Sequence, residues 1–117
     1  MIKKTLILVL ASCFAAPAFA GDAAAGADKA KQVCAACHGA DGNTPSAPDF
    51  PKLAGQHENY LLQALKQYKS GARKNPIMAA QVQPLSAKDM ENLAAYYAAQ
   101  SGSLYLIKES RLHSAGN

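Results

Sequence analysis

The chain has 117 residues and a formal net charge of +4 at pH 7; half of its residues are hydrophobic but only 7% are aromatic. Its basic residues are dispersed, which excludes the clustered basic stripe that binding to a phosphate backbone requires. A chain of this length holds one domain, and its mostly small apolar side chains bury too little surface for a stable core without a supplement.

Residues 1–20 have the layout of a secretory signal peptide. Lys3 and Lys4 form the basic start, an apolar run follows, and Ala18-Phe19-Ala20 is a small-residue cleavage site. The apolar run is too short to span a bilayer. We therefore expect export to a bacterial periplasm, cleavage near Ala20 and no stable membrane insertion. The remaining 97 residues (117 less 20) carry ten basic and eight acidic side chains.

A second kind of processing stays open as an alternative. Leu10-Ala11-Ser12-Cys13 has the form of a bacterial lipoprotein site, which would leave a lipid on Cys13. The apolar stretch before it is short for that pathway, so we favour Cys13 as part of a discarded peptide. The exported chain then keeps only Cys34 and Cys37, which predicts no structural disulfide.

The first helix is predicted over residues 23–34, with Asp22 as its N-cap. At its end stands the motif CxxCH, formed by Cys34-Ala35-Ala36-Cys37-His38. This is the attachment sequence of c-type haem: each thiol adds to one vinyl group, and the histidine reaches the iron as proximal ligand. A bare CxxC also occurs in redox dithiols and zinc sites. The added His38 favours haem c, and the lack of a second CxxCH in the sequence predicts one haem.

The middle of the chain is predicted to be a helix between two loops. Frequent glycine and proline residues from Gly39 to Gly55 predict a compact loop. A helix over residues 57–70 is predicted, ending at Gly71, because apolar residues recur there on one face. These residues are Tyr60, Leu61, Ala64, Leu65 and Tyr68. Residues 71–85, which contain Pro76 and Pro84, are predicted to form a second irregular loop.

The last helix is predicted to open at Ser86, where Asp89 three residues on forms a capping box, and to fray near Gln100. Its buried stripe consists of Met90, Leu93, Ala94 and Tyr97. No strand-like alternation occurs in residues 21–100, which predicts one all-α domain with three main helices. Residues 101–117 are expected to be a poorly ordered extension, with a partner-docking segment or a surface strap as alternatives.

A haem iron held by one histidine needs a sixth ligand, or has an open site. The candidates in the exported chain are Met78, Met90, His57 and His113. Met78 lies in a loop constrained by Pro76, which can bring a thioether to the iron without unwinding a helix. Met90 is expected in the core, His57 at a charged helix start, and His113 in a polar tail. We assign Met78, with an open or water-bound iron as the alternative.

The chain resembles the small bacterial class I c-type cytochromes, especially one haem domain of the diheme type. Besides the CxxCH motif and Gly39, the resemblance is carried by Phe50-Pro51-Lys52-Leu53-Ala54-Gly55-Gln56, Tyr60-Leu61, Gly71-Ala72-Arg73, Asn75-Pro76-Ile77-Met78, Leu85-Ser86 and Leu93-Ala94-Ala95-Tyr96-Tyr97. It covers nearly all of residues 21–100 and implies the class I cytochrome c fold, with helices and loops wrapped around one haem. In that fold the first and last helices cross, which would bring Gly26 against Tyr96 or Tyr97.

Further roles follow from this resemblance. The carbonyl of Pro51 would accept the Nδ1 proton of His38, which orients the imidazole. Leu53 would pack on the haem. Arg73 would pair with a haem propionate, and its alternative role is a solvated cation at a helix C-terminus. A histidine and methionine pair favours ferrous iron and suits one-electron transfer better than oxygen binding.

The predicted function is that of a monomeric electron carrier without catalytic residues. Its partners would be redox proteins, such as a respiratory complex, a terminal oxidase or a reductase, and not nucleic acid. Electrons would leave through the haem edge near Ala35, Ala36 and Ala40 in transient contacts. Three alternatives stay open: a thiol–disulfide oxidoreductase, a haem enzyme or gas sensor with an open iron, and a subunit of a larger oxidoreductase. The first is disfavoured because no strand precedes the motif.

Overall fold

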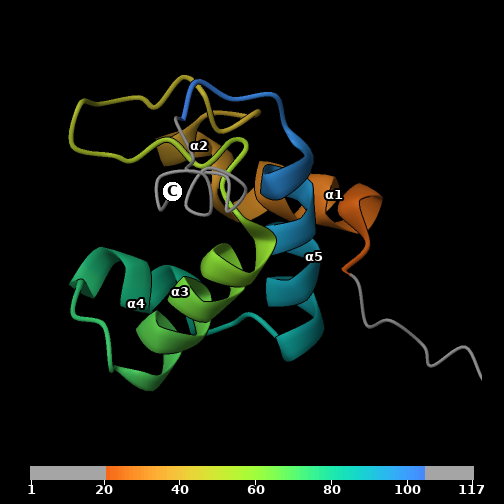
Figure 1. Cartoon of the computed structure of the whole chain (residues 1–117). Helices are drawn as coiled ribbons and strands as arrows, with labels where there is room; N and C mark the ends of the chain where they lie inside the picture. Colours follow the sequence, from red (N-terminus) through yellow and green to blue (C-terminus); the bar gives the residue numbers. More distant parts are fainter. Residues whose placement is uncertain (1–20, 105–117) are drawn as a thin grey trace, which may run out of the picture.

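The computed structural model describes residues 21–104, in which the regular secondary structure is entirely helical (Figure 1). The helices are α1 (Ala23–Val33), α2 (Ala35–His38), α3 (Glu58–Ser70), α4 (Pro76–Val82) and α5 (Ala87–Ala99), and this range contains no strand. The predicted all-α class is therefore confirmed. Within residues 21–104, no helix has the length and apolar character needed to cross a membrane. The predictions on residues 1–20 and on His113 fall outside the described residues.

The three long helices begin and end at the residues that the sequence predicts, within one position. The side chain of Asp22 accepts hydrogen bonds from the first turn of α1 at 2.9 and 3.1 Å. Gly71 ends α3 in the left-handed conformation, with φ of 79°. Ser86 and Asp89 form a reciprocal capping box at the start of α5, at 2.9 and 3.0 Å. These caps satisfy backbone groups that a helix end would otherwise leave without partners.

The prediction of an irregular loop over residues 71–85 is wrong, because Pro76–Val82 is the helix α4. Asn75 is its N-cap, and the Asn75 side chain accepts a hydrogen bond from the Met78 backbone N–H at 3.0 Å. Proline is favoured at the first position of a helix, where its missing N–H and its fixed φ cost nothing. Pro76 therefore starts a helix here rather than breaking one, and Met78 stands on a helical turn instead of a loop.

Helices α1 and α5 cross at close range (Figure 1). At the crossing, a Cβ atom on Gly26 would lie 2.0 Å from the carbonyl oxygen of Asn92 and 2.8 Å from the Cβ atom of Tyr96. Only a glycine permits this approach. The backbone N–H of Asp22 donates to Oδ1 of Asn92 at 2.7 Å, beside the crossing. The predicted crossing is present, and Tyr96 is the tyrosine that meets Gly26.

The core is small and is built mainly by α5. The predicted stripe of Met90, Leu93, Ala94 and Tyr97 is buried, together with Ala30, Leu61, Val82 and Leu85 from elsewhere. Among the described residues only two large side chains, Leu93 and Val82, are fully enclosed. A core this sparse agrees with the expectation, drawn from composition, that a bound group supplements it.

Candidate functional site

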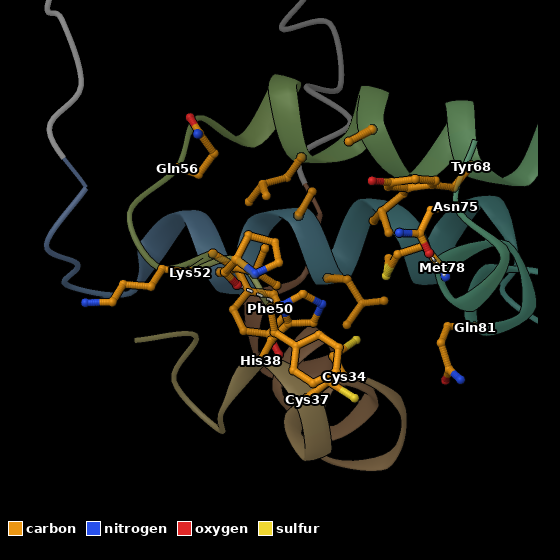
Figure 2. Close-up of a pocket in the computed structure, with 18 of the residues that line it drawn as sticks. Cys34, Cys37, His38, Phe50, Lys52, Gln56, Tyr68, Asn75, Met78 and Gln81 are labelled. Carbon is orange, nitrogen blue, oxygen red and sulfur yellow. Dashed lines mark hydrogen bonds between the residues drawn. The ribbon is translucent and has the colours of Figure 1, made fainter. Parts of the chain in front are cut away.

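One cavity of about 470 Å³ opens between the CxxCH segment, the loop after it and helices α3, α4 and α5 (Figure 2). This volume lies within the range of about 300–1,000 Å³ that is usual for ligand and cofactor pockets. One wall is the apolar face of α3 that the sequence pattern predicts. Its members are Tyr60, Leu61, Ala64, Leu65 and Tyr68. The site is therefore a largely apolar cavity that is also lined by a few polar and sulfur-containing side chains.

The CxxCH segment supplies two thiols and one imidazole to the cavity. Cys34 is the C-cap of α1, and Cys37 and His38 follow on the single turn of α2, which continues from α1. Both cysteines are half-buried free thiols and both line the cavity. Figure 2 shows the two sulfur atoms on the same side of the open space as the ring of His38.

The orientation of His38 is fixed by the loop that follows. Its Nδ1 atom donates a hydrogen bond to the carbonyl oxygen of Pro51 at 2.8 Å, the contact that the family resemblance implies. His38 as a whole is 7% exposed, and the Phe50 ring meets its imidazole edge-on with centroids 6.2 Å apart. Because a carbonyl oxygen only accepts, Nδ1 is the donor in this hydrogen bond, which leaves Nε2 as the ring nitrogen that can bind a metal ion.

A thioether reaches the cavity from a different helix. Met78, in the first turn of α4, is half-buried and lines the cavity together with Asn75 (Figure 2). The other candidates among the described residues do not line it: Met90 belongs to the core, and His57 is an exposed residue before α3. Met78 is thus the candidate sixth ligand that the fold brings to the same space as His38.

Leu53 and Arg73, the remaining predicted site residues, also line the cavity. Leu53 is half-buried and packs against the core cluster. The Arg73 guanidinium is exposed, and its central carbon lies 5.1 Å from the ring centroid of Tyr68. Interaction with the Tyr60 hydroxyl raises the pKa of the Arg73 guanidinium. Arg73 therefore places a cation at the exposed rim of the cavity, which is compatible with either of its two predicted roles.

Burial shapes the chemistry of Cys34. It raises the pKa of the Cys34 thiol to about 11, although the nearby Tyr97 hydroxyl acts in the opposite direction. The thiol is therefore protonated at neutral pH, whereas a redox dithiol needs a thiolate of low pKa. The Tyr97 hydroxyl is itself buried, without a hydrogen-bond partner of normal geometry among the described residues. The raised pKa of Cys34 argues against a thiol that exchanges disulfides.

Taken together, the cavity offers two thiols, one imidazole with a free Nε2 and one thioether, all facing apolar walls. This donor set suits a flat, apolar macrocycle whose metal needs two axial ligands and whose edge is bonded to sulfur. Tyr97, predicted in the core stripe, and Leu104, predicted in the extension, both line the cavity. The helical period could have indicated Tyr97, because the α5 stripe faces this space. No local pattern indicates Leu104.

Comparison with known proteins gives the family. The sequence model of the cytochrome c family matches residues 23–99. The chain is 50% identical over 94 residues to cytochrome c4 of Stutzerimonas stutzeri, covering 73% of this chain and 44% of that protein. It is 46% identical over 84 residues to cytochrome c-554(548) of Halomonas halodenitrificans, covering 69% of this chain and 99% of that protein.

A solved structure agrees with these sequence relatives. Reduced recombinant cytochrome c4 from Pseudomonas stutzeri superposes with a TM-score of 0.66 at 49% identity, covering 73% of this chain and 48% of that one. The chain thus spans about half the length of the cytochrome c4 proteins that it matches, and nearly the whole of the shorter relative.

Proposed function

The chain belongs to the cytochrome c family, as a class I c-type cytochrome similar to one domain of the diheme type, and from this we propose a periplasmic one-electron carrier of a bacterial respiratory chain. Members of this family transfer electrons with a covalently bound haem c. The observation that carries the proposal is the arrangement of His38 and Met78, which reach one apolar cavity from two directions.

We assign each donor of the cavity a role. Cys34 and Cys37 would hold the haem through two thioether bonds, and Nε2 of His38 and the sulfur of Met78 would bind its iron. Haem c supplies a single iron that exchanges one electron between its ferrous and ferric states. The protein's contribution is to hold both ligands in place, so that neither position opens to oxygen or peroxide.

Each proposed ligand is held in place by a neighbouring residue through a hydrogen bond. Pro51 holds the His38 ring through the 2.8 Å hydrogen bond, and Asn75 caps the turn of α4 that carries Met78. Little rearrangement is then needed when the iron changes charge. A neutral thioether paired with an imidazole also raises the reduction potential relative to two histidines. In the same proposal Leu53 packs on the macrocycle and Arg73 pairs with a propionate.

The proposed route for electrons includes a surface that the sequence did not indicate. Ala36 and Ala40 are exposed near the CxxCH segment, where docking was expected, and Ala35 is half-buried. Tyr60 and Ile77, however, lie at the cavity rim and are 50% and 55% exposed. They are the exposed large hydrophobic side chains in the described part of the chain. We propose that a respiratory complex, terminal oxidase or reductase docks transiently on one of these two surfaces.

The domain limits belong to the same proposal. Residues 1–20 would direct export and be removed near Ala20, residues 21–100 would form the cytochrome domain, and residues 101–117 would follow as an extension. Mass spectrometry of the periplasmic protein checks this directly. A mass corresponding to residues 21–117 plus one haem is expected, and a lipid on Cys13 would point to the alternative processing.

The ligand assignment is tested by a matched pair of variants, Met78→Leu and Met90→Leu. The exchange conserves volume, so neither variant should lose its fold. In the ferric optical spectrum, the sulfur-to-iron charge-transfer band should disappear in the Met78 variant and persist in the Met90 variant. Persistence of the band in Met78→Leu would remove the assignment, and a high-spin wild-type spectrum would favour an open iron instead.

A further inference from the structure

Four residues beyond the family match lie against the loop that follows the CxxCH motif. The match ends at residue 99, and Ser101–Leu104, which we name the strap, runs beside the loop of residues 51–55 (Figure 1). The Asn43 side-chain amide donates to the carbonyl oxygen of Ser101 at 2.6 Å. Farther along, the Lys52 ammonium group donates to the hydroxyl of Ser103 at 3.0 Å.

Between these hydrogen bonds the two backbones are in close contact. A Cβ atom on Gly102 would lie 2.0 Å from the carbonyl oxygen of Ala54 and 3.1 Å from its Cβ atom. The strap therefore packs on Ala54 with no room for a side chain. The N–H of Gly55 also donates to the carbonyl oxygen of Tyr97 at 2.9 Å, which joins the same loop to the end of α5. Such a fit distinguishes the strap from a chain end that merely follows the last helix.

The strap ends inside the functional site. Leu104 is half-buried and lines the cavity, as do Pro51, Lys52 and Leu53 of the loop beneath it. An apolar side chain at this place reduces the contact of the cavity with water. Burial and solvent exposure are among the factors that set the reduction potential of a haem.

The same loop orients the proximal ligand. Pro51 accepts the hydrogen bond from Nδ1 of His38, and the strap contacts the loop one and three residues later, at Lys52 and Ala54. A loop held at these points keeps the Pro51 carbonyl in position. The contacts thus form a continuous path from Gly102 through Ala54 and Pro51 to the imidazole of His38.

We propose that Ser101–Leu104 is part of the cofactor site: the strap clamps the loop that positions His38, and Leu104 closes the cavity against water and external ligands. This inference rests on the proposed haem ligation. It assigns a binding and positioning role to residues that lie beyond the family match. A change in the strap is therefore expected to alter the orientation of His38 and the exposure of the iron to water, while His38 and Met78 remain the ligands.

The test uses the full-length holoprotein with two matched pairs of variants. Gly102→Ala places a methyl group against the Ala54 carbonyl, whereas Ser101→Ala, next to it, keeps the carbonyl that Asn43 binds. Leu104→Ser puts a hydroxyl group at the cavity wall, whereas Leu104→Met keeps the wall apolar. The readouts are the reduction potential and the rate at which cyanide binds to the ferric protein.

Gly102→Ala and Leu104→Ser should lower the reduction potential and speed cyanide binding about tenfold, because each opens the cavity to water. In each pair the conservative variant, Ser101→Ala or Leu104→Met, should differ from the wild type less than Gly102→Ala or Leu104→Ser does. Wild-type values in both Gly102→Ala and Leu104→Ser would overturn the proposal. If Gly102→Ala fails to fold, the Leu104 pair decides. A wild-type protein without a c-type spectrum would instead refute the proposed function itself, so the two failures are distinguishable.

Discussion

Gly26→Ala is expected to destabilise the protein although alanine is the better helix former. In an unhindered helix interior this exchange would stabilise by about 0.5–1 kcal/mol. Here the added Cβ atom would lie 2.0 Å from the carbonyl oxygen of Asn92, whereas such atoms normally stay at least about 3.3 Å apart. Helices α1 and α5 must therefore separate by roughly 1 Å.

The expected magnitude follows from two costs. Overpacking of a close contact costs about 1–3 kcal/mol. Separation also weakens the 2.7 Å hydrogen bond from Asp22 to Asn92, worth about 0.5–1.5 kcal/mol. After subtraction of the gain in helix propensity, we expect a loss of about 1–3 kcal/mol. For a domain of this size that lowers Tm by about 5–20 °C.

The assay is thermal unfolding of the ferric holoprotein, followed by far-UV circular dichroism. Ala25→Gly serves as the control, because Ala25 is an exposed neighbour in the same helix and the exchange reverses the propensity effect. It should lower stability by only about 0.5–1 kcal/mol. A Tm for Gly26→Ala equal to or above that of the wild type would refute the close crossing of α1 and α5.

Three further outcomes are expected. Asn75→Ala should lower the free energy of unfolding by about 1 kcal/mol, because it removes the N-cap of α4. On heating, the charge-transfer band of this variant should fade at a lower temperature than that of the wild type. An unchanged fading temperature would show that the cap does not support Met78. Hydrogen bonds from Ser86, and then the hydrogen bond and charge of Lys29, lower the pKa of Asp89 below its usual 3.8 in the folded protein. The ionised Asp89 therefore stabilises the fold above pH 3.8, and this stabilisation is lost as the pH falls through the folded pKa. Asp89→Asn should therefore be less stable than the wild type at pH 7, by about 1 kcal/mol, with the gap closing in acid during denaturant titrations; a gap independent of pH would contradict this. Tyr97→Phe should leave Tm unchanged or raise it, because among residues 21–104 the buried Tyr97 hydroxyl has no hydrogen-bond partner of normal geometry. A marked fall in Tm would show that the hydroxyl is hydrogen-bonded in the holoprotein.

The sequence alone predicts the three long helices because their signals are local. Asp22, Gly71 and the pair of Ser86 and Asp89 mark helix ends by their own side-chain and backbone preferences, and the structure uses all of them. The sequence does not predict helix α4 because a proline such as Pro76 can have two opposite effects on a helix. It breaks a helix from within but favours one at the first position, and the cap formed by Asn75 decides between them.

The site was predictable where covalent chemistry fixes the spacing, and less so where tertiary packing decides. The spacing of Cys34, Cys37 and His38 follows from the group that they are proposed to hold, so the motif predicts that group from the local sequence alone. Leu104 carries no such pattern. It reaches the cavity only because Gly102 fits against Ala54. These two residues are 48 positions apart in the sequence, and no helical or strand periodicity indicates their contact.

X-ray absorption at the iron edge, recorded on the ferric and the ferrous holoprotein, tests the central claim most directly. The proposed pair of His38 and Met78 predicts one axial nitrogen and one axial sulfur in both oxidation states, with little change in distance. Absence of the sulfur, or its presence in only one state, would contradict an iron that changes its charge while keeping both ligands.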